Sequence, residues 1–230
     1  MLIGPQNLTL HVNHVRSRIR TAATAAGRNP ESVTLVAVTK GKTAESVRLA
    51  ATAGVTDFGE NYLQEALAKM DQLADLKLKW HFIGGIQSNK TRAIAERFDW
   101  VQSVDRFSVA RRLSEQRPFH APPLNVCIQV ALVPEPTKGG VAPDELAELA
   151  RAIAGLPRLV LRGLMCVPPP QPNAAAERAV FAKLRAALDD LNAGGLKLDT
   201  LSMGMSGDFE PAIAEGATLV RIGTALFGAR

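Results

Sequence analysis

The fold is decided by residues 33–58, which read VTLVAVTKGKTAESVRLAATAGVTDF. The opening of this stretch, 33–38, is an apolar run of the kind found in buried parallel strands. A helical pattern follows over about 44–53 and stops at Gly54, and a second strand is expected at 56–58. A strand, a helix and a strand in this order predict a βαβ unit.

The same alternation continues along the rest of the chain. Strands are expected at 33–38, 56–58, 78–83, 100–104, 124–130, 159–165, 200–203 and 218–222. Helices are expected at about 44–53, 62–73, from near 88, 107–116, from Pro143, 174–191 and 208–215. Eight strands alternating with helices in 230 residues predict an α/β fold, a single (β/α)₈ TIM-type barrel with residues 1–230 as one domain. A doubly wound open sheet is the structural alternative.

Residues 1–30 are expected to form an additional N-terminal helix packed on the barrel. Apolar residues recur at three- and four-residue steps from Leu8 to Ala26, and Gly27 and Pro30 end the pattern. The segment also has basic residues and no acidic ones, which is typical of a transit peptide. The periodicity favours the packed helix.

The composition of the chain indicates which classes of binding partner are to be expected. Hydrophobic residues make up 47% of the chain and charged residues 21%, as in globular proteins. No apolar run is long enough for a membrane span, so no membrane association is expected. The net charge of +5 would fit a nucleic-acid binder, but the basic residues are scattered and aromatic residues make up only 5%. We therefore expect no nucleic-acid partner.

Cys127 and Cys166 both lie in apolar stretches. Such cysteines are typically buried thiols, and a chain without a disulfide fits the reducing cytoplasm. Their spacing to each other and to the histidines does not match a metal site, so no metal is expected.

Lys40 follows the first strand, where barrel enzymes place their chemistry. The apolar run behind it would partly desolvate the amine and favour the neutral form that attacks an aldehyde. Taken alone, Lys40 would be interpreted as a solvated surface lysine, because most lysines are. Lys42 competes for the same role but sits further into the loop, where we expect it to be solvated.

Two glycine-containing loops indicate a phosphate site. Barrels often bind phosphate with the loops after strands seven and eight. Here these loops are Gly204-Met205-Ser206-Gly207-Asp208 and Arg221-Ile222-Gly223-Thr224. Glycine lets the backbone approach a phosphate closely, and hydroxyl side chains add donors. A barrel lysine with a phosphate site indicates either a pyridoxal 5′-phosphate (PLP) site or a Schiff-base aldolase without the vitamin.

Seven motifs, in chain order, carry a resemblance to a known family. They are Val36-Ala37-Val38-Thr39-Lys40, Phe58-Gly59-Glu60-Asn61-Tyr62, His81-Phe82-Ile83-Gly84, Gln87-Ser88-Asn89-Lys90, Arg162-Gly163-Leu164-Met165, Ser202-Met203-Gly204-Met205-Ser206 and Val220-Arg221-Ile222-Gly223-Thr224-Ala225-Leu226-Phe227-Gly228. From about residue 8 to residue 230 the chain resembles the pyridoxal phosphate homeostasis protein family. The resemblance implies a barrel like the N-terminal domain of bacterial alanine racemase and a role in vitamin B6 balance, in which the protein stores or delivers PLP.

The resemblance also implies roles for individual residues. Lys40 matches the lysine that binds PLP covalently as a Schiff base, and Asn61 matches a polar residue near the ring. Arg221 matches the arginine beside the pyridine nitrogen. The residues that match the family's phosphate cup are Ser206, Gly223 and Thr224.

Three further positions concern affinity and release. Lys138 lies where the family has a second lysine tied to cofactor release. Gly85 stands where many members have proline, and Gly207 where many have an acidic residue. These two departures affect the rigidity and charge of loops at the mouth and leave the lysine unchanged.

An arginine beside the pyridine nitrogen favours a carrier over a catalyst. Guanidinium stays charged and accepts no proton, so Arg221 would leave the ring a weak electron sink. Racemisation also needs two bases, and in alanine racemase the second is a tyrosine from another domain, whereas the sequence here ends at Arg230. We expect Tyr62 to be a packing or rim residue and His81 to be part of a structural hydrogen bond. Little or no enzymatic turnover is therefore expected.

Three functions stay open on the sequence. The first is a PLP-binding homeostasis protein, the second a PLP-dependent amino-acid racemase-like enzyme, and the third a Schiff-base aldolase. For the first, the expected partners are PLP and, as candidate recipients, PLP-dependent apoenzymes. A monomer is expected.

Overall fold

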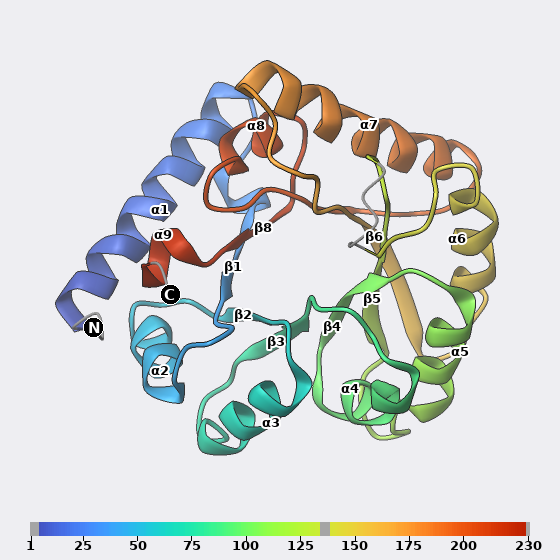
Figure 1. The fold of residues 1–230 in the computed structure, drawn as a ribbon, viewed down its shortest axis with the longest axis horizontal. Coiled ribbons are helices and arrows are strands. Elements are labelled where there is room, and N and C mark those ends of the chain that lie inside the picture. Colours follow the sequence, from blue (N-terminus) through green and yellow to red (C-terminus); the bar gives the residue numbers. More distant parts are fainter. Residues whose placement is uncertain (1–4, 134–138, 229–230) are drawn as a thin grey trace.

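The protein is a closed parallel barrel surrounded by helices (Figure 1). This computed structural model describes residues 5–133 and 139–228. Within these residues, eight strands pair in chain order and the last pairs with the first. The strands are β1 (Thr34–Val38), β2 (Asp57–Glu60), β3 (Lys79–Phe82), β4 (Trp100–Val104), β5 (Leu124–Gln129), β6 (Leu159–Met165), β7 (Thr200–Ser202) and β8 (Leu219–Ile222). The barrel prediction is confirmed, and the open-sheet alternative is wrong because β1 bonds to β8.

Helices cover the outside of the barrel, as the alternation predicts. Their bounds are α1 (Pro5–Ala25), α2 (Ala44–Thr52), α3 (Leu63–Gln72), α4 (Thr91–Arg97), α5 (Phe107–Gln116), α6 (Leu146–Ala154), α7 (Ala174–Ala193), α8 (Phe209–Ala214) and α9 (Thr224–Phe227), with 3₁₀ turns η1 (Pro30–Ser32) and η2 (Ser88–Lys90). Three features differ from expectation. The helix expected from near residue 88 begins at Thr91, after the turn η2, and the helix expected from Pro143 begins at Leu146. The short α9 was not expected.

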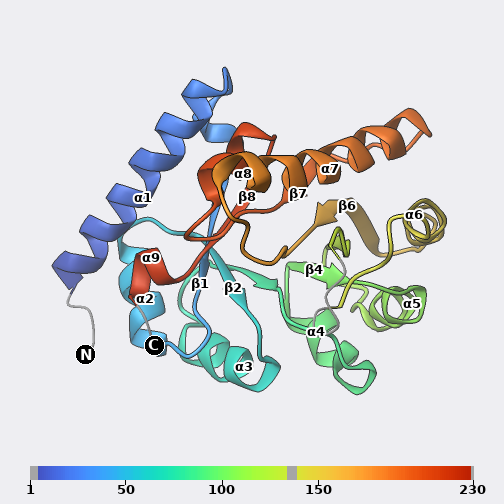
Figure 2. The ribbon, with the colours of Figure 1, turned by 45° about the horizontal axis from the view of Figure 1, so that its top comes forward.

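The N-terminal helix α1 is packed on the barrel, as its periodicity predicts. Its buried side chains are Leu8, Val12, Val15, Ile19 and Ala23. In the ring of helices, α1 lies against α8, α9 and α2 (Figures 1 and 2). A hydrogen bond of 2.9 Å from His11 Nδ1 to the Leu226 carbonyl oxygen joins α1 to α9.

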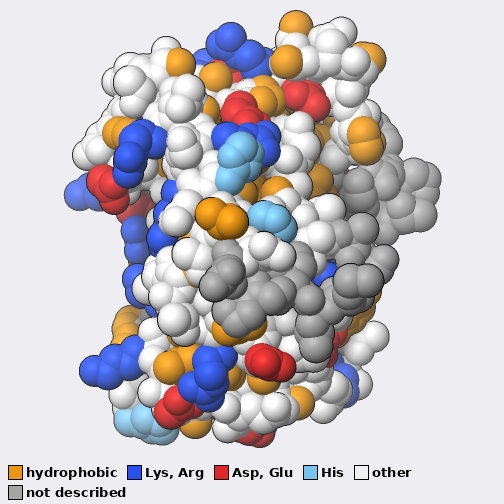
Figure 3. All heavy atoms as spheres, turned by 90° about the vertical axis from the view of Figure 1, so that its left-hand side faces the viewer, with side chains coloured by type: hydrophobic (Ala, Val, Ile, Leu, Met, Phe, Trp, Pro, Cys, Tyr) orange, Lys and Arg blue, Asp and Glu red, His pale blue; other side chains and the backbone are white. Residues whose placement is uncertain are grey.

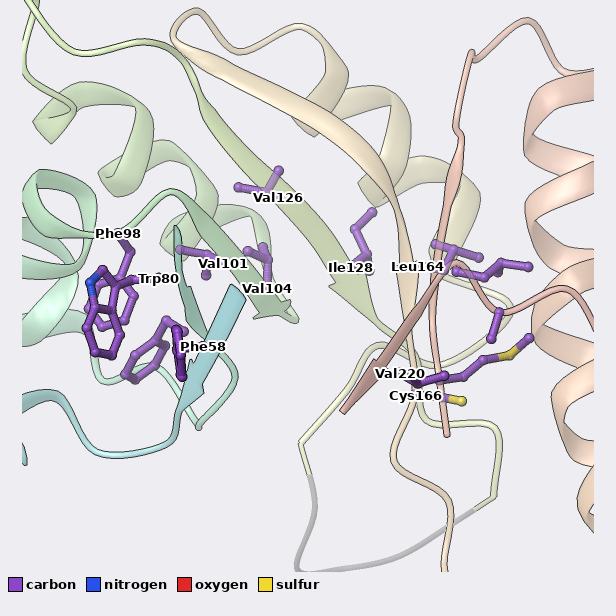
Figure 4. Close-up of a cluster of buried hydrophobic side chains, with 14 of the residues drawn as sticks. Phe58, Trp80, Phe98, Val101, Val104, Val126, Ile128, Leu164, Cys166 and Val220 are labelled. Carbon is purple, nitrogen blue, oxygen red and sulfur yellow. The ribbon is translucent and has the colours of Figure 1, made fainter. Parts of the chain in front are cut away.

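The hydrophobic core lies mainly between the strands and the helices. Phe58 and Trp80 pack there with ring centroids 5.8 Å apart, and Phe82 meets Phe98 edge-on at 5.3 Å. Figure 4 shows Phe58, Trp80 and Phe98 gathered together beside the barrel wall. Complete burial of one such ring contributes about 2–3 kcal/mol to folding.

The cysteines and the surface agree with the composition. Cys127 and Cys166 are buried free thiols, as expected. On the face shown in Figure 3, hydrophobic side chains are scattered among charges of both signs. Among the described residues, no helix combines the length and the apolar character needed to cross a membrane.

Candidate functional site at the barrel mouth

The alternation of side chains along β1 sets the direction of Lys40. Val36 is paired with Arg221 of β8, whose guanidinium lies inside the barrel. A Cβ on the neighbouring Gly59 of β2 would contact both Val36 and Val38, so these two side chains lie on the same, interior side of the barrel wall. Successive side chains of a strand point to opposite faces, so the same alternation continued to Lys40 directs it to the interior side of the mouth. Lys40 is half-buried there.

Lys40 sits in a tight turn that ends β1. The Lys42 N–H donates to the Thr39 carbonyl oxygen at 3.0 Å, and Gly41 has φ +69°. Glycine adopts this φ without strain, as a type II turn requires at its third position. The Lys42 side chain is half-buried, and its Nζ donates to the Phe227 carbonyl oxygen at 3.0 Å. The expectation that Lys42 is solvated is therefore wrong, because α9 supplies an acceptor.

Asn61 lies beside Lys40 at the end of the neighbouring strand. Val38 pairs with Gly59, so the register continued by two residues brings Lys40 level with Asn61. Asn61 Oδ1 is buried and accepts no hydrogen bond from the residues that the structure describes. An unsatisfied buried acceptor costs about 1–3 kcal/mol, so this atom indicates a place for a ligand donor.

The loops after β7 and β8 are joined to each other. The Ala225 N–H donates to Ser206 Oγ at 3.2 Å, and the Arg221 N–H donates to the Gly204 carbonyl oxygen at 3.0 Å. Thr224 is exposed as the first residue of α9, and Gly223 packs against Val38 of β1. Ser206, Gly223 and Thr224 therefore lie on two connected loops, next to the strand that ends at Lys40.

Arg221 of β8 is buried below these loops, with its guanidinium inside the barrel. Its Nη1 donates to Ser202 Oγ at 2.6 Å and its Nη2 to the Cys166 carbonyl oxygen at 2.8 Å. Burial lowers the pKa of Arg221 from its ordinary value. A guanidinium nevertheless remains charged in a protein, so Arg221 presents a fixed positive charge with donors only.

A hydrogen-bond chain continues from Arg221 across the barrel interior. Ser202 Oγ donates to Gln102 Oε1 at 2.6 Å, although β7 and β4 are not neighbouring strands. Gln102 Nε2 lies 2.8 Å from His81 Nδ1, and His81 Nε2 lies 3.0 Å from Asp57 Oδ1. His81 is thus a structural hydrogen-bonding residue, as expected.

Sequence reasoning missed Gln102 and Asp57. A glutamine inside the apolar run 100–104 was the available signal, since an uncharged polar side chain in a buried strand needs a partner. Nothing in the sequence indicated that this partner comes from β7.

Four other positions that the sequence analysis named are Gly85, Gly207, Tyr62 and Lys138. Gly85 and Gly207 are both exposed, and a Cβ at either would meet no atom within 4 Å. Tyr62 is 59% exposed at the start of α3, as a rim residue. Lys138 lies outside the described residues.

Comparisons with known proteins agree on one family. A family model for the alanine racemase N-terminal domain matches residues 10–230. The pyridoxal phosphate homeostasis protein of Pseudomonas aeruginosa is 62% identical over 220 residues, covering 96% of this chain and 94% of that protein. That of Escherichia coli is 49% identical over 219 residues, with 94% of each chain covered.

A solved structure extends the comparison to three dimensions. PipY of Synechococcus elongatus with PLP bound has a TM-score of 0.86 and 39% sequence identity, covering 96% of this chain and 100% of that chain. By fold and by sequence, this chain belongs to the pyridoxal phosphate homeostasis protein family, whose barrel is that of the alanine racemase N-terminal domain.

Proposed function

We propose that the protein binds PLP as a Schiff base on Lys40 and takes part in intracellular vitamin B6 homeostasis by storing or delivering PLP. In the proposed linkage, the neutral Lys40 amine attacks the aldehyde carbon, a C=N bond forms and the carbonyl oxygen leaves as water. The observation that carries the proposal is the arrangement at the mouth. Lys40, in the turn after β1, stands between Asn61 after β2 and Gly223 after β8.

The residues present fit the chemistry of PLP. The buried acceptor Asn61 Oδ1 suits the ring hydroxyl, which donates a hydrogen bond. The hydroxyls of Ser206 and Thr224 and the close backbone at Gly223 suit the phosphate. Arg221 supplies the positive charge proposed to lie beside the pyridine nitrogen.

Two observations favour a carrier over a racemase-like enzyme. Arg221 donates hydrogen bonds to Ser202 Oγ and the Cys166 carbonyl oxygen, and a guanidinium beside the pyridine nitrogen would leave the ring a weak electron sink. His81, the histidine considered as a base, uses both ring nitrogens in bonds to Asp57 and Gln102. The proposed recipients of PLP are PLP-dependent apoenzymes. The proposed oligomeric state is a monomer, and the proposed location is the cytoplasm.

The site is tested by intact mass after borohydride reduction in the presence of PLP. Borohydride delivers hydride to the C=N bond and fixes the cofactor as a secondary amine. Wild-type protein should gain one reduced PLP, and Lys40→Ala should gain none. Lys42→Ala is the matched control, since it removes the neighbouring lysine, and it should gain the adduct. An adduct that persists in Lys40→Ala, or a wild-type protein that gains none, would contradict the proposal.

The carrier role has a separate test. Wild-type protein loaded with PLP should reactivate a PLP-dependent apoenzyme and should not racemise amino acids at rates typical of enzymes. Racemisation at such rates would support the enzyme alternative instead.

A further inference from the structure

A buried ion-pair cluster lies on the outer side of the barrel wall, behind the turn that carries Lys40. Lys69 of α3 has a side chain 5% exposed, and that of Glu60 at the end of β2 is fully buried. Lys69 Nζ lies 2.7 Å from Glu60 Oε1 and 2.5 Å from Glu65 Oε1. Burial raises the pKa of Glu60, although the bonds from Lys69 and Thr39 act in the opposite direction. Buried ion pairs of this kind are weak contributors to stability, so the cluster calls for another explanation.

The cluster contacts the backbone on both sides of Lys40. Lys69 Nζ donates to the Thr39 carbonyl oxygen at 2.5 Å. Glu65 Oε1 accepts the N–H of Gly41 at 2.6 Å. These groups belong to the two peptide units that join Lys40 to its neighbours, so both units are fixed to the cluster.

The Thr39 side chain adds a third contact. Its Oγ1 donates to Glu60 Oε1 at 2.6 Å, on the face opposite to the barrel interior. Because adjacent side chains point to opposite faces, an anchored Thr39 directs Lys40 inward. The turn therefore has little freedom to rotate.

We propose that Lys69, together with Glu60 and Glu65, is a positioning residue for Lys40. The three side chains hold the turn so that the Lys40 amine is presented to the mouth in one orientation. This inference rests on the proposed Schiff base and deepens it. A displacement of about 1 Å at a reacting group reduces a rate by about 100-fold, so anchoring of this kind affects how fast the linkage forms.

The first test uses Glu65, which lies at the outer edge of the cluster and whose loss should leave the fold intact. Glu65→Ala removes the acceptor for the Gly41 N–H, and it should slow Schiff-base formation about tenfold when PLP is mixed with cofactor-free protein. Formation is followed by visible absorbance. Glu65→Gln keeps an acceptor oxygen and should restore the rate to within about twofold. Glu115→Ala is the matched control, because Glu115 also pairs with a basic residue four positions away, on α5, and its rate should be unchanged.

A second readout separates positioning from loss of the whole site. Pyridoxine 5′-phosphate has the ring and the phosphate but no aldehyde, so it can occupy the site without reacting with Lys40. Glu65→Ala should bind it with wild-type affinity while forming the Schiff base slowly. If Glu65→Ala reduced the affinity for pyridoxine 5′-phosphate as much as the rate of Schiff-base formation, the inference would be overturned.

The core of the cluster is tested with a charge-neutral pair of substitutions. Lys69→Met alone would leave the buried Glu60 unpaired and destabilise the protein, so it is combined with Glu60→Gln. The double variant should form the Schiff base about 100-fold more slowly, with its affinity for pyridoxine 5′-phosphate unchanged. A wild-type rate in this variant and in Glu65→Ala would overturn the positioning role and leave the site on Lys40 intact. Failure of the wild-type protein to react would instead refute the proposed function.

Discussion

The hydrogen bonds that link Arg221 to Asp57 through Ser202, Gln102 and His81 all run in one direction, with the donor on the Arg221 side of each bond. Burial alone would raise the pKa of Asp57, but hydrogen bonds from His81 and Thr56 outweigh it and hold the pKa below its ordinary value. An ionised Asp57 accepts from His81 Nε2, which leaves Nδ1 as the acceptor for the Gln102 amide. Gln102 Oε1 is then free to accept from the Ser202 hydroxyl, whose oxygen accepts from Arg221. The positive charge of Arg221 is thus matched by a negative charge at the far end of an uncharged chain.

Two adjacent glycines provide a residue-level test of the mouth. A Cβ on Gly84 would lie 2.0 Å from the Asn61 carbonyl oxygen, whereas a Cβ on Gly85 would meet nothing within 4 Å. Gly84→Ala should therefore displace Asn61, lower the free energy of unfolding by about 1–3 kcal/mol and weaken PLP binding. Urea denaturation measures the free energy of unfolding, and titration with PLP measures the binding.

Gly85→Ala is the control for this pair. It should change the free energy of unfolding by less than about 0.5 kcal/mol and leave PLP binding unchanged. Equal behaviour of the two variants would mean that the approach of Gly84 to Asn61 does not shape the site.

At the scale of elements, strands within the repeating strand–helix alternation are predictable from sequence, whereas a short helix outside it is not. The strands at 100–104 and 159–165 have the expected bounds. The first lies between Asp99 and Asp105, and the second begins directly after Arg158. Helix α9 has four residues and no periodicity to detect, and its carbonyls are bonded by His11 and Lys42 from distant parts of the chain. Its position is therefore a tertiary effect.

The same reason limits prediction of the site. Lys40 and the two loops near the end of the chain could be proposed together as site residues because each follows a strand. Lys69 does not, because its role depends on the packing of α3 against the turn after β1. Gln102 and Ser202 are a hundred residues apart in the chain and meet only once the barrel has closed.

Helix α1 offers an element-level prediction with a control on the same helix. Leu8 is 1% exposed and Leu10 is 64% exposed. Leu8→Ala should lower the free energy of unfolding by about 2 kcal/mol or more, since it leaves a cavity under the helix. Leu10→Ala should change it by less than about 0.5 kcal/mol. Urea denaturation of both variants measures the difference, and equal losses would show that α1 is not packed on the barrel through the Leu8 face.

At the scale of the whole molecule, the proposed PLP site can form only when the barrel is closed. Lys40 and Asn61 directly follow the ends of the first two strands, whereas Arg221 and Gly223 lie near the end of the chain. Strand β1 brings these groups together by pairing with both β2 and β8. A ligand that contacts both groups binds the closed barrel alone and should stabilise it. If any one strand opened, the binding site would be lost and the core would be exposed at the same time, so binding and folding are expected to be cooperative.

The two cysteines report on this cooperativity. Burial raises the pKa of Cys127 and of Cys166 to about 12, and the reactive species is the thiolate. At pH 8 only about 1 in 10⁴ of the folded thiols would be ionised, against about a tenth in the unfolded chain, where the pKa is about 9. Iodoacetamide should therefore label both cysteines slowly and at the same rate in native protein, and rapidly in urea. Mass spectrometry of timed samples measures the rates.

The pH dependence of stability follows from the same two thiols. The folded state keeps its thiol protons up to about pH 12, whereas the unfolded chain releases them near its ordinary pKa of about 9. The unfolded state binds fewer protons between these values, so stability is full below pH 9 and falls as the pH rises towards 12. Replacing both cysteines by alanine should remove this part of the alkaline loss, measured as the difference between the two proteins in urea midpoints from pH 8 to pH 10. In the iodoacetamide experiment, fast labelling of one cysteine in native protein would show that the barrel opens around it without unfolding as a whole.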